Sequence, residues 1–152
     1  MSTRFLFDVT FYLTVPFWLL MIFAPTTKVT AKIVATPWIA ALPLVVYFLL
    51  ALPHFGQLWD VVSVPNLDTL VAFVREPYGA AAIWAQIISF DLFIGRWIHL
   101  ESRRLGLHPL VEGPILVLTI FLSPFALVLF LAVRSALERR KLDAVSPAPA
   151  AA

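Results

Sequence analysis

An aspartate and an arginine lie five residues apart within a segment that is otherwise apolar enough to enter a lipid bilayer. The segment is Gly79–Leu100, GAAAIWAQIISFDLFIGRWIHL, and the two residues are Asp91 and Arg96. A charged side chain at the bilayer centre costs about 2.5–3.5 kcal/mol on insertion scales, so a membrane helix that keeps one commonly uses it. Its uses are ligand contact, proton transfer or a buried ion pair. We therefore treat Asp91 and Arg96 as the candidate catalytic residues.

Asp91 is predicted to lie near mid-depth, because about 1.5 Å per residue places it roughly 18 Å along the helix. A neutral carboxylic acid there polarises or protonates a substrate oxygen, and an ionised one removes a proton. Arg96 is one turn from the end of the segment, so its side chain can reach the interface. The two side chains are about 140° apart around the helix and do not form an i,i+4 pair. Structural roles stay open for both: helix packing for Asp91 and interfacial anchoring for Arg96.

Four further residues are predicted to line a substrate site. Trp84 and Gly95 share a helix face with Asp91, and Asp8 and Tyr12 share a face of the first apolar segment. A carboxylate near a helix start also interacts favourably with the positive end of the helix dipole, so a structural role for Asp8 stays open.

The sequence contains no motif for metal, nucleotide or nucleic-acid chemistry. The absence of cysteine excludes thiolate ligands and disulfides. His99, Glu101, His108 and Glu112 are too loosely spaced for a metal site. No glycine-rich phosphate loop, Gly-x-Ser-x-Gly or His-Glu-x-x-His is present, and the net charge of +2 comes without a basic stripe. We therefore predict no metal, no cofactor and no nucleic-acid partner.

The composition indicates which elements position these residues. The chain is 61% hydrophobic and 13% charged, against about 45–50% and 25% in soluble domains, which is typical of an integral membrane protein in contact with the lipid bilayer. Runs of about 20 apolar residues cross a bilayer as helices, and four such runs are predicted: 6–24, 36–52, 79–100 and 113–133. The fold is therefore predicted to be all-α, a polytopic four-helix transmembrane domain over residues 1–141 with a disordered tail over 142–152.

Smaller features refine this prediction. Asn66–Arg75 places apolar residues at helical spacing, which predicts a short amphipathic interfacial helix between the second and third spans. Ala81, Ala85 and Ser89 form a stripe of small residues that lets helices approach closely. Pro16, Pro43 and Pro124 fall inside predicted helices and should kink them.

The segment before the first span and the charges of the loops predict the location and the orientation. No Arg- and Ser-rich leader precedes the first span, which favours a bacterial plasma membrane over import into an organelle. With four crossings, six Lys and Arg residues lie on the side of the termini and four on the other side. The positive-inside rule then predicts that both termini are cytoplasmic.

Two blocks resemble the abscisic-acid-deficient-four family of neoxanthin synthase-like membrane proteins. Val15–Lys32, VPFWLLMIFAPTTKVTAK, resembles the family's LPF-x-x-LM-x-x-AP…VT-x-K block, and Trp84–Trp97, WAQIISFDLFIGRW, resembles its W-x-x-x-x-x-x-DLF-x-x-R block. The positions in register include Pro25, Lys32, Asp91, Leu92, Phe93 and Arg96. The resemblance extends over roughly residues 5–134. One position departs from it: Gln86 stands where the plant block carries a histidine.

The resemblance implies a small four-helix membrane protein of carotenoid biosynthesis, found in plastid membranes in plants. The family's plant reaction converts violaxanthin to neoxanthin by opening an epoxide, an isomerisation that needs no redox cofactor. The first hypothesis is therefore a protein that binds a carotenoid or similar isoprenoid, with or without isomerising it. The alternatives are a non-catalytic membrane subunit or scaffold and a small proton-coupled transporter subunit. Four helices are few for a transporter, so that alternative requires a homo-oligomer.

Overall fold

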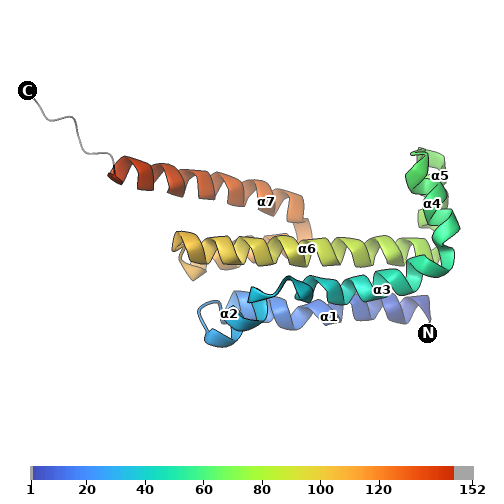
Figure 1. Ribbon diagram of the computed structural model, residues 1–152, viewed down its shortest axis with the longest axis horizontal. Helices are drawn as coiled ribbons and strands as arrows, with labels where there is room; N and C mark the ends of the chain where they lie inside the picture. Colours follow the sequence, from blue (N-terminus) through green and yellow to red (C-terminus); the bar gives the residue numbers. More distant parts are fainter. Residues whose placement is uncertain (1, 146–152) are drawn as a thin grey trace, which may run out of the picture.

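The computed structural model describes residues 2–145, and all regular elements within this range are helices (Figure 1). Its α-helices are α1 (Thr3–Phe23), α2 (Lys28–Ala35), α3 (Ala41–Ala51), α4 (Phe55–Ser63), α5 (Leu67–Arg75), α6 (Pro77–Leu105) and α7 (Pro109–Val145). Two 3₁₀ turns, η1 (Pro37–Ala40) and η2 (Leu52–His54), flank α3. The predicted all-α fold is confirmed.

The long helix α6 is the centre of the bundle, and α1, α3, α5 and α7 all pack against it. The predicted small-residue stripe explains the close approach of α3, because Ala81, Ala85 and Ser89 are all buried. The Ser89 hydroxyl also donates a 2.5 Å hydrogen bond to the carbonyl of Ala40. On another side, the indole of Trp18 lies directly over Gly95. Small residues thus allow α6 to be contacted from several sides.

Four helical segments are long and apolar enough to cross a membrane by length and composition: Thr3–Phe23, Pro37–Ser63, Pro77–Leu105 and Pro109–Lys141. They coincide with the four predicted segments, although each is longer than predicted. The third begins with Pro77 at its first turn, where a missing N–H is harmless. It ends at Gly106, whose φ of 73° is the left-handed conformation that glycine adopts readily.

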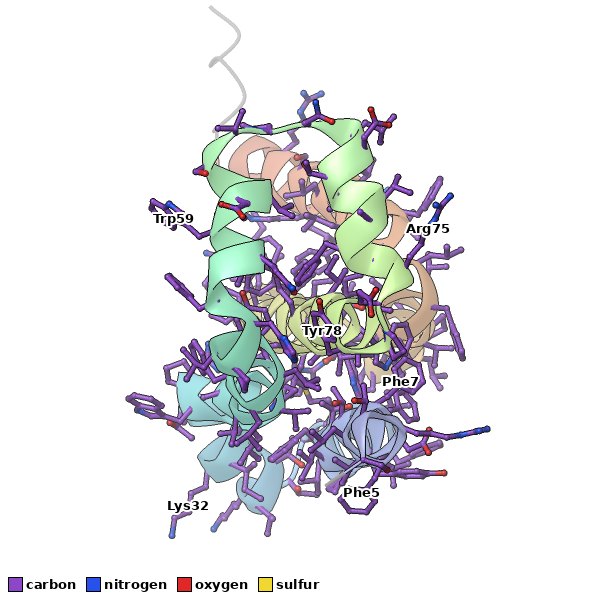
Figure 2. The ribbon with its side chains drawn as sticks, turned by 90° about the vertical axis from the view of Figure 1, so that its right-hand side faces the viewer. Phe5, Phe7, Lys32, Trp59, Arg75 and Tyr78 are labelled. Atoms are coloured by element: carbon purple, nitrogen blue, oxygen red, sulfur yellow. The ribbon has the colours of Figure 1, made fainter. Side chains whose placement is uncertain are left out.

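The amphipathic helix predicted over residues 66–75 is present as α5, which begins after the N-cap Asn66. It pairs with the unpredicted helix α4, and Figure 2 shows the two standing side by side beyond the bundle. We call α4 and α5 together the arm. The arm joins the bundle where Phe73, 5% exposed, packs edge-on against Tyr78 at the start of α6.

Within the fourth predicted segment, residues 113–133, helix α7 is broken at Leu122. The backbone there is non-helical, with φ −145° and ψ 60°. Ser123 and Pro124 follow, and serine before proline is a typical helix start. The break therefore coincides with one of the three predicted proline kinks. We call residues 109–122 the entering arm of α7 and residues 123–145 its returning arm.

The two arms of α7 run in opposite directions beside α6 (Figure 1). The entering arm is antiparallel to α6, because Glu112 contacts His99 whereas Ser123 faces Asp91. The returning arm is parallel to α6: Phe130 packs on Trp97, Glu138 pairs with Arg104, and Lys141 donates to the carbonyl of Leu105. The fourth apolar segment is therefore a helical hairpin.

The ends of the described chain lie at opposite ends of α6. Helix α1 is parallel to α6, since Phe7 stacks on Trp84 and Trp18 lies over Gly95. Its N-terminus is therefore near Pro77, whereas the last residues of α7 lie near Leu105. Residues 142–145 of the predicted disordered tail continue helix α7, and residues 146–152 lie outside the described range.

Candidate functional site

Asp91 lies midway along α6, fourteen residues from each end of the helix. Its side chain is only 8% exposed and lies against the break in α7. The hydroxyl of Ser123 faces the carboxyl group, and both side chains line the same groove. The carboxyl group is thus held between helices at the tip of the hairpin, and does not point away from the bundle.

A groove of about 470 Å³ opens at this point between α6 and the hairpin tip. Its lining is formed by Ile87, Phe90, Asp91, Ile94, Phe121, Leu122, Ser123, Pro124 and Phe125. Only two of these side chains are polar, Asp91 and Ser123, and they lie together among aromatic and aliphatic groups. Such a groove suits a mostly apolar ligand with one polar end group.

The broken backbone adds polarity to the same place. Proline lacks an N–H, so Pro124 leaves a carbonyl of the preceding turn without its helical hydrogen bond. A second helix starts here, and its first N–H groups are also free of helical acceptors. Non-helical backbone at membrane depth is tolerated where it is buried in protein or lines a cavity. Discontinuous helices build midplane ligand sites in other membrane proteins in this way.

The residues that form this groove all lie within the match to a known protein family. The model of the ABA DEFICIENT 4-like family, ABA4-like, matches residues 5–130. The chain belongs to the ABA4-like family. No curated protein and no solved structure matches it significantly. The matched range includes Asp91 and the hairpin tip, so both parts of the groove lie within the family domain.

In this ABA4-like chain, Arg96 does not join Asp91. Its Nε donates to the carbonyl of Val34 and one of its terminal nitrogens donates to that of Ala35, both at 2.8 Å. These carbonyls belong to the last turn of α2, which lacks helical donors for them. Arg96 therefore caps α2 and fixes it against α6. Within residues 2–145, Asp91 has no ion-pair partner.

None of the other four predicted substrate residues lines the Asp91 groove. Trp84 stacks on Phe7 with ring centroids 5.3 Å apart, and its indole N–H has no acceptor in the described part of the chain. Gly95 is covered by Trp18, which leaves no room for a ligand. Asp8 and Tyr12 are exposed on the outer face of α1. Asp91, Trp84 and Gly95 share a helix face, but each contacts a different neighbour and they do not form one site.

Sequence reasoning missed a second polar site, at the base of the hairpin. His99 Nδ1 lies 2.5 Å from the carboxylate of Glu112, and both side chains are at least 98% buried. The other oxygen of Glu112 pairs with Arg103, which also donates to the carbonyl of Leu107. We call His99, Arg103 and Glu112 the basal triad.

A second set of ion pairs, which we call the outer layer, joins the same end of α6 to the returning arm. Arg134 Nε lies 2.8 Å from Glu101, and Glu138 lies between Arg104 and Arg134. In the sequence these residues look like interfacial charges, because the hairpin that brings residues 101 and 134 together is not visible there. The described residues contain no group of three His, Cys, Asp or Glu side chains suited to a metal ion.

Proposed function

We propose that this ABA4-like protein binds a carotenoid or a similar long isoprenoid, with the polar end ring in the Asp91 groove, and isomerises that ring by opening an epoxide. The observation that carries the proposal is the pairing of one carboxyl and one hydroxyl group in an otherwise apolar groove midway along α6. Family membership supports the same ligand class, because the resemblance implies a reaction on an end ring of a carotenoid.

The groove also fits an elongated ligand. Pro124 and Phe125 line the Asp91 groove and equally a second apolar groove of about 620 Å³, which continues along the returning arm past Val128, Leu129 and Ala132. A chain whose end ring meets Asp91 would therefore find apolar surface along α7. This continuity favours a long hydrocarbon over a compact ligand.

The proposed reaction requires two proton-transfer groups from the protein. Opening an epoxide needs an acid at the ring oxygen and a base at the carbon that loses a proton. Because an isomerisation has no net redox change, the proton given to oxygen and the proton taken from carbon balance. One carboxyl group can serve in both steps, and Ser123 can orient the oxygen. We assign the catalytic role to Asp91; Arg96 holds the end of α2, which does not line the groove.

The test is pigment binding and conversion by matched variants. The wild-type chain, Asp91→Asn and Asp8→Asn would be expressed in cells that accumulate an epoxycarotenoid, then purified and extracted for chromatography. We expect wild type and Asp8→Asn to retain pigment and to produce an isomer, because Asp8 is an exposed aspartate on a membrane helix. Asp91→Asn should lose the isomer. Equal product from all three chains would rule out the catalytic assignment.

One observation favours the scaffold alternative, in which the protein is not an enzyme. Asp91 faces Ser123, so their contact also fixes the tip of the hairpin to α6. In that case Asp91→Asn would lower the stability of the purified protein and the wild type would carry no pigment. The transporter alternative requires a homo-oligomer and predicts pH-dependent flux in proteoliposomes that disappears in Asp91→Asn. For the chain itself we propose a bacterial plasma membrane.

A further inference from the structure

Both ends of α7 are attached to the same end of α6. At the start of α7, Glu112 contacts His99 and Arg103. Near its other end, Lys141 donates a 3.1 Å hydrogen bond to the carbonyl of Leu105. A straight helix of this length would place residues 112 and 141 about 44 Å apart. The contacts therefore require that α7 turns back.

The turn occurs at mid-depth. The entering arm contains fourteen residues, or about 21 Å of helix, whereas a crossing needs about 30 Å. Its tip meets Asp91, the midpoint of α6, on the groove side. The returning arm then leads the chain back toward Leu105. Neither half of α7 reaches the Pro77 end of α6. The α4–α5 pair extends from that end (Figure 1).

We propose that α7 is a re-entrant hairpin, so that the chain crosses the membrane three times, with its N-terminus and the α4–α5 arm on the non-cytoplasmic side and the base of the hairpin in the cytoplasm. This topology replaces the predicted arrangement with both termini in the cytoplasm. It stands on the geometry of α7 and does not rest on the proposed carotenoid chemistry.

The distribution of positive charge determines the orientation. All eleven Lys and Arg residues lie within the described range. Eight lie at the hairpin-base end: Lys28, Lys32, Arg103, Arg104, Arg134, Arg139, Arg140 and Lys141. Two, Arg4 and Arg75, lie at the opposite end, and Arg96 lies within α6. The six-to-four distribution of a four-crossing chain thus becomes eight to two, and the positive-inside rule places the base of the hairpin in the cytoplasm.

The arm fits the opposite interface. It extends across the end of the bundle, roughly perpendicular to α6 in Figure 1, as an interfacial helix pair would. It exposes large apolar side chains, including Phe55, Trp59, Val62, Leu67 and Val74. Trp59 and Arg75 lie on opposite outer sides of the arm (Figure 2). Aromatic and charged groups of this kind are typical of the headgroup level of a bilayer.

This topology places the Asp91 groove relative to the two leaflets of the bilayer. Both arms of the hairpin lie on the cytoplasmic side of its tip, where Phe93 of α6 is also half exposed. On the other side of the tip, Ile87 and Phe90 remain about half exposed. The apolar surface that continues from the groove past Val128, Leu129 and Ala132 lies on the cytoplasmic side of the tip, so a ligand chain bound there would occupy the cytoplasmic leaflet.

Single cysteines can test the topology cleanly, because the chain has no native cysteine. Thr26→Cys, Ser63→Cys and Arg140→Cys each alter an exposed position in an otherwise full-length chain. A membrane-impermeant maleimide would be applied to intact cells and to inverted vesicles. We expect Ser63→Cys to be labelled only in cells, and Thr26→Cys and Arg140→Cys only in inverted vesicles. Full labelling of all three in detergent serves as the control.

Each other pattern overturns a defined part of the proposal. Labelling of positions 26 and 140 from opposite sides would mean that α7 crosses the membrane. Labelling of both in intact cells and of position 63 in vesicles would keep the hairpin and reverse the orientation. As a second measurement, a short bis-maleimide should cross-link the double variant Arg104→Cys/Glu138→Cys. The double variant Ser63→Cys/Glu138→Cys should give no cross-link. Failure of the first pair to cross-link would exclude the returning arm.

Discussion

The tip and the base of the α7 hairpin both hold buried polar groups, yet they pair them very differently. At the base, the Glu112 carboxylate has partners on both oxygens, and the outer layer of ion pairs lies at the same end of α6. At the tip, Asp91 meets one serine and a groove. The Glu112 carboxylate is fully paired, although the Nε of Arg103 has no hydrogen-bond partner, whereas the Asp91 carboxyl group retains capacity for a ligand. We therefore expect the base to contribute stability, and we propose that the tip binds the ligand.

The largest expected effect is at the base. Glu112→Ala would leave the buried His99 and the guanidinium of Arg103 without their shared partner. Removing one member of a buried ionic group costs about 3–5 kcal/mol, so we expect a loss of that order in the free energy of unfolding. Denaturation of the purified protein in mild detergent measures it. Glu112→Gln keeps an acceptor for His99 and should lose less; equal stability of all three chains would contradict the assignment.

At the tip, we expect a substitution to lower ligand binding more than stability. Asp91→Asn keeps the shape of the side chain and its capacity to accept from Ser123, so the free energy of unfolding should change by less than about 1 kcal/mol. Ligand retention should fall about tenfold or more, equivalent to about 1.4 kcal/mol of binding free energy. Pigment bound per protein and an unfolding curve on the same sample separate the two quantities. A large stability loss with unchanged pigment would reverse the comparison.

Ser123→Ala sharpens the comparison within the tip. The Ser123 hydroxyl faces Asp91, and the net contribution of one such hydrogen bond to stability is about 0.5–1.5 kcal/mol. We expect a loss at the low end of this range together with partial loss of pigment. Ser135→Ala, at an exposed position of the same arm, is the matched control and should change neither. Identical behaviour of the two variants would remove Ser123 from the site.

The smallest effect is expected in the outer layer. Arg134→Ala removes the contacts with Glu101 and Glu138, both of which keep Arg104 as a partner. The loss of stability should therefore be well below that of Glu112→Ala. Because salt screens partly exposed charges, the difference from wild type should shrink between low and high salt. A salt-independent difference as large as that of Glu112→Ala would show that the two layers act as one network.

Much of this fold follows from local sequence signals. The four apolar segments, the amphipathic helix that became α5 and the small-residue stripe on α6 each depend on neighbouring residues, and each is found in the structure. Asp91 was singled out because a carboxyl group is costly in a long apolar segment, and the structure places it in a buried position. For Arg96 the same argument could not distinguish a catalytic role from capping of α2.

The α7 hairpin and the ion pairs at its base depend on contacts between residues that are distant in the sequence. Residues 101 and 134 pair only because α7 reverses, and the reversal was hidden by a segment long and apolar enough to be a single span. Pro124 was read as a kink, although the Ser123–Pro124 pair is also a helix start. The substrate role of Asp8 and Tyr12 was inferred from a shared helix face alone, and that face is turned away from the bundle.

The single break at Leu122 has a consequence for biosynthesis. As α7 leaves the ribosome, nothing in its hydrophobicity prevents the insertion machinery from placing it as an ordinary stop-transfer helix. In the proposed topology, the hairpin forms when α7 docks on the finished α6, where Glu138 pairs with Arg104 and Lys141 donates to the carbonyl of Leu105. Chains in which that docking fails would carry their C-terminus into the wrong compartment, where quality-control proteases could recognise them.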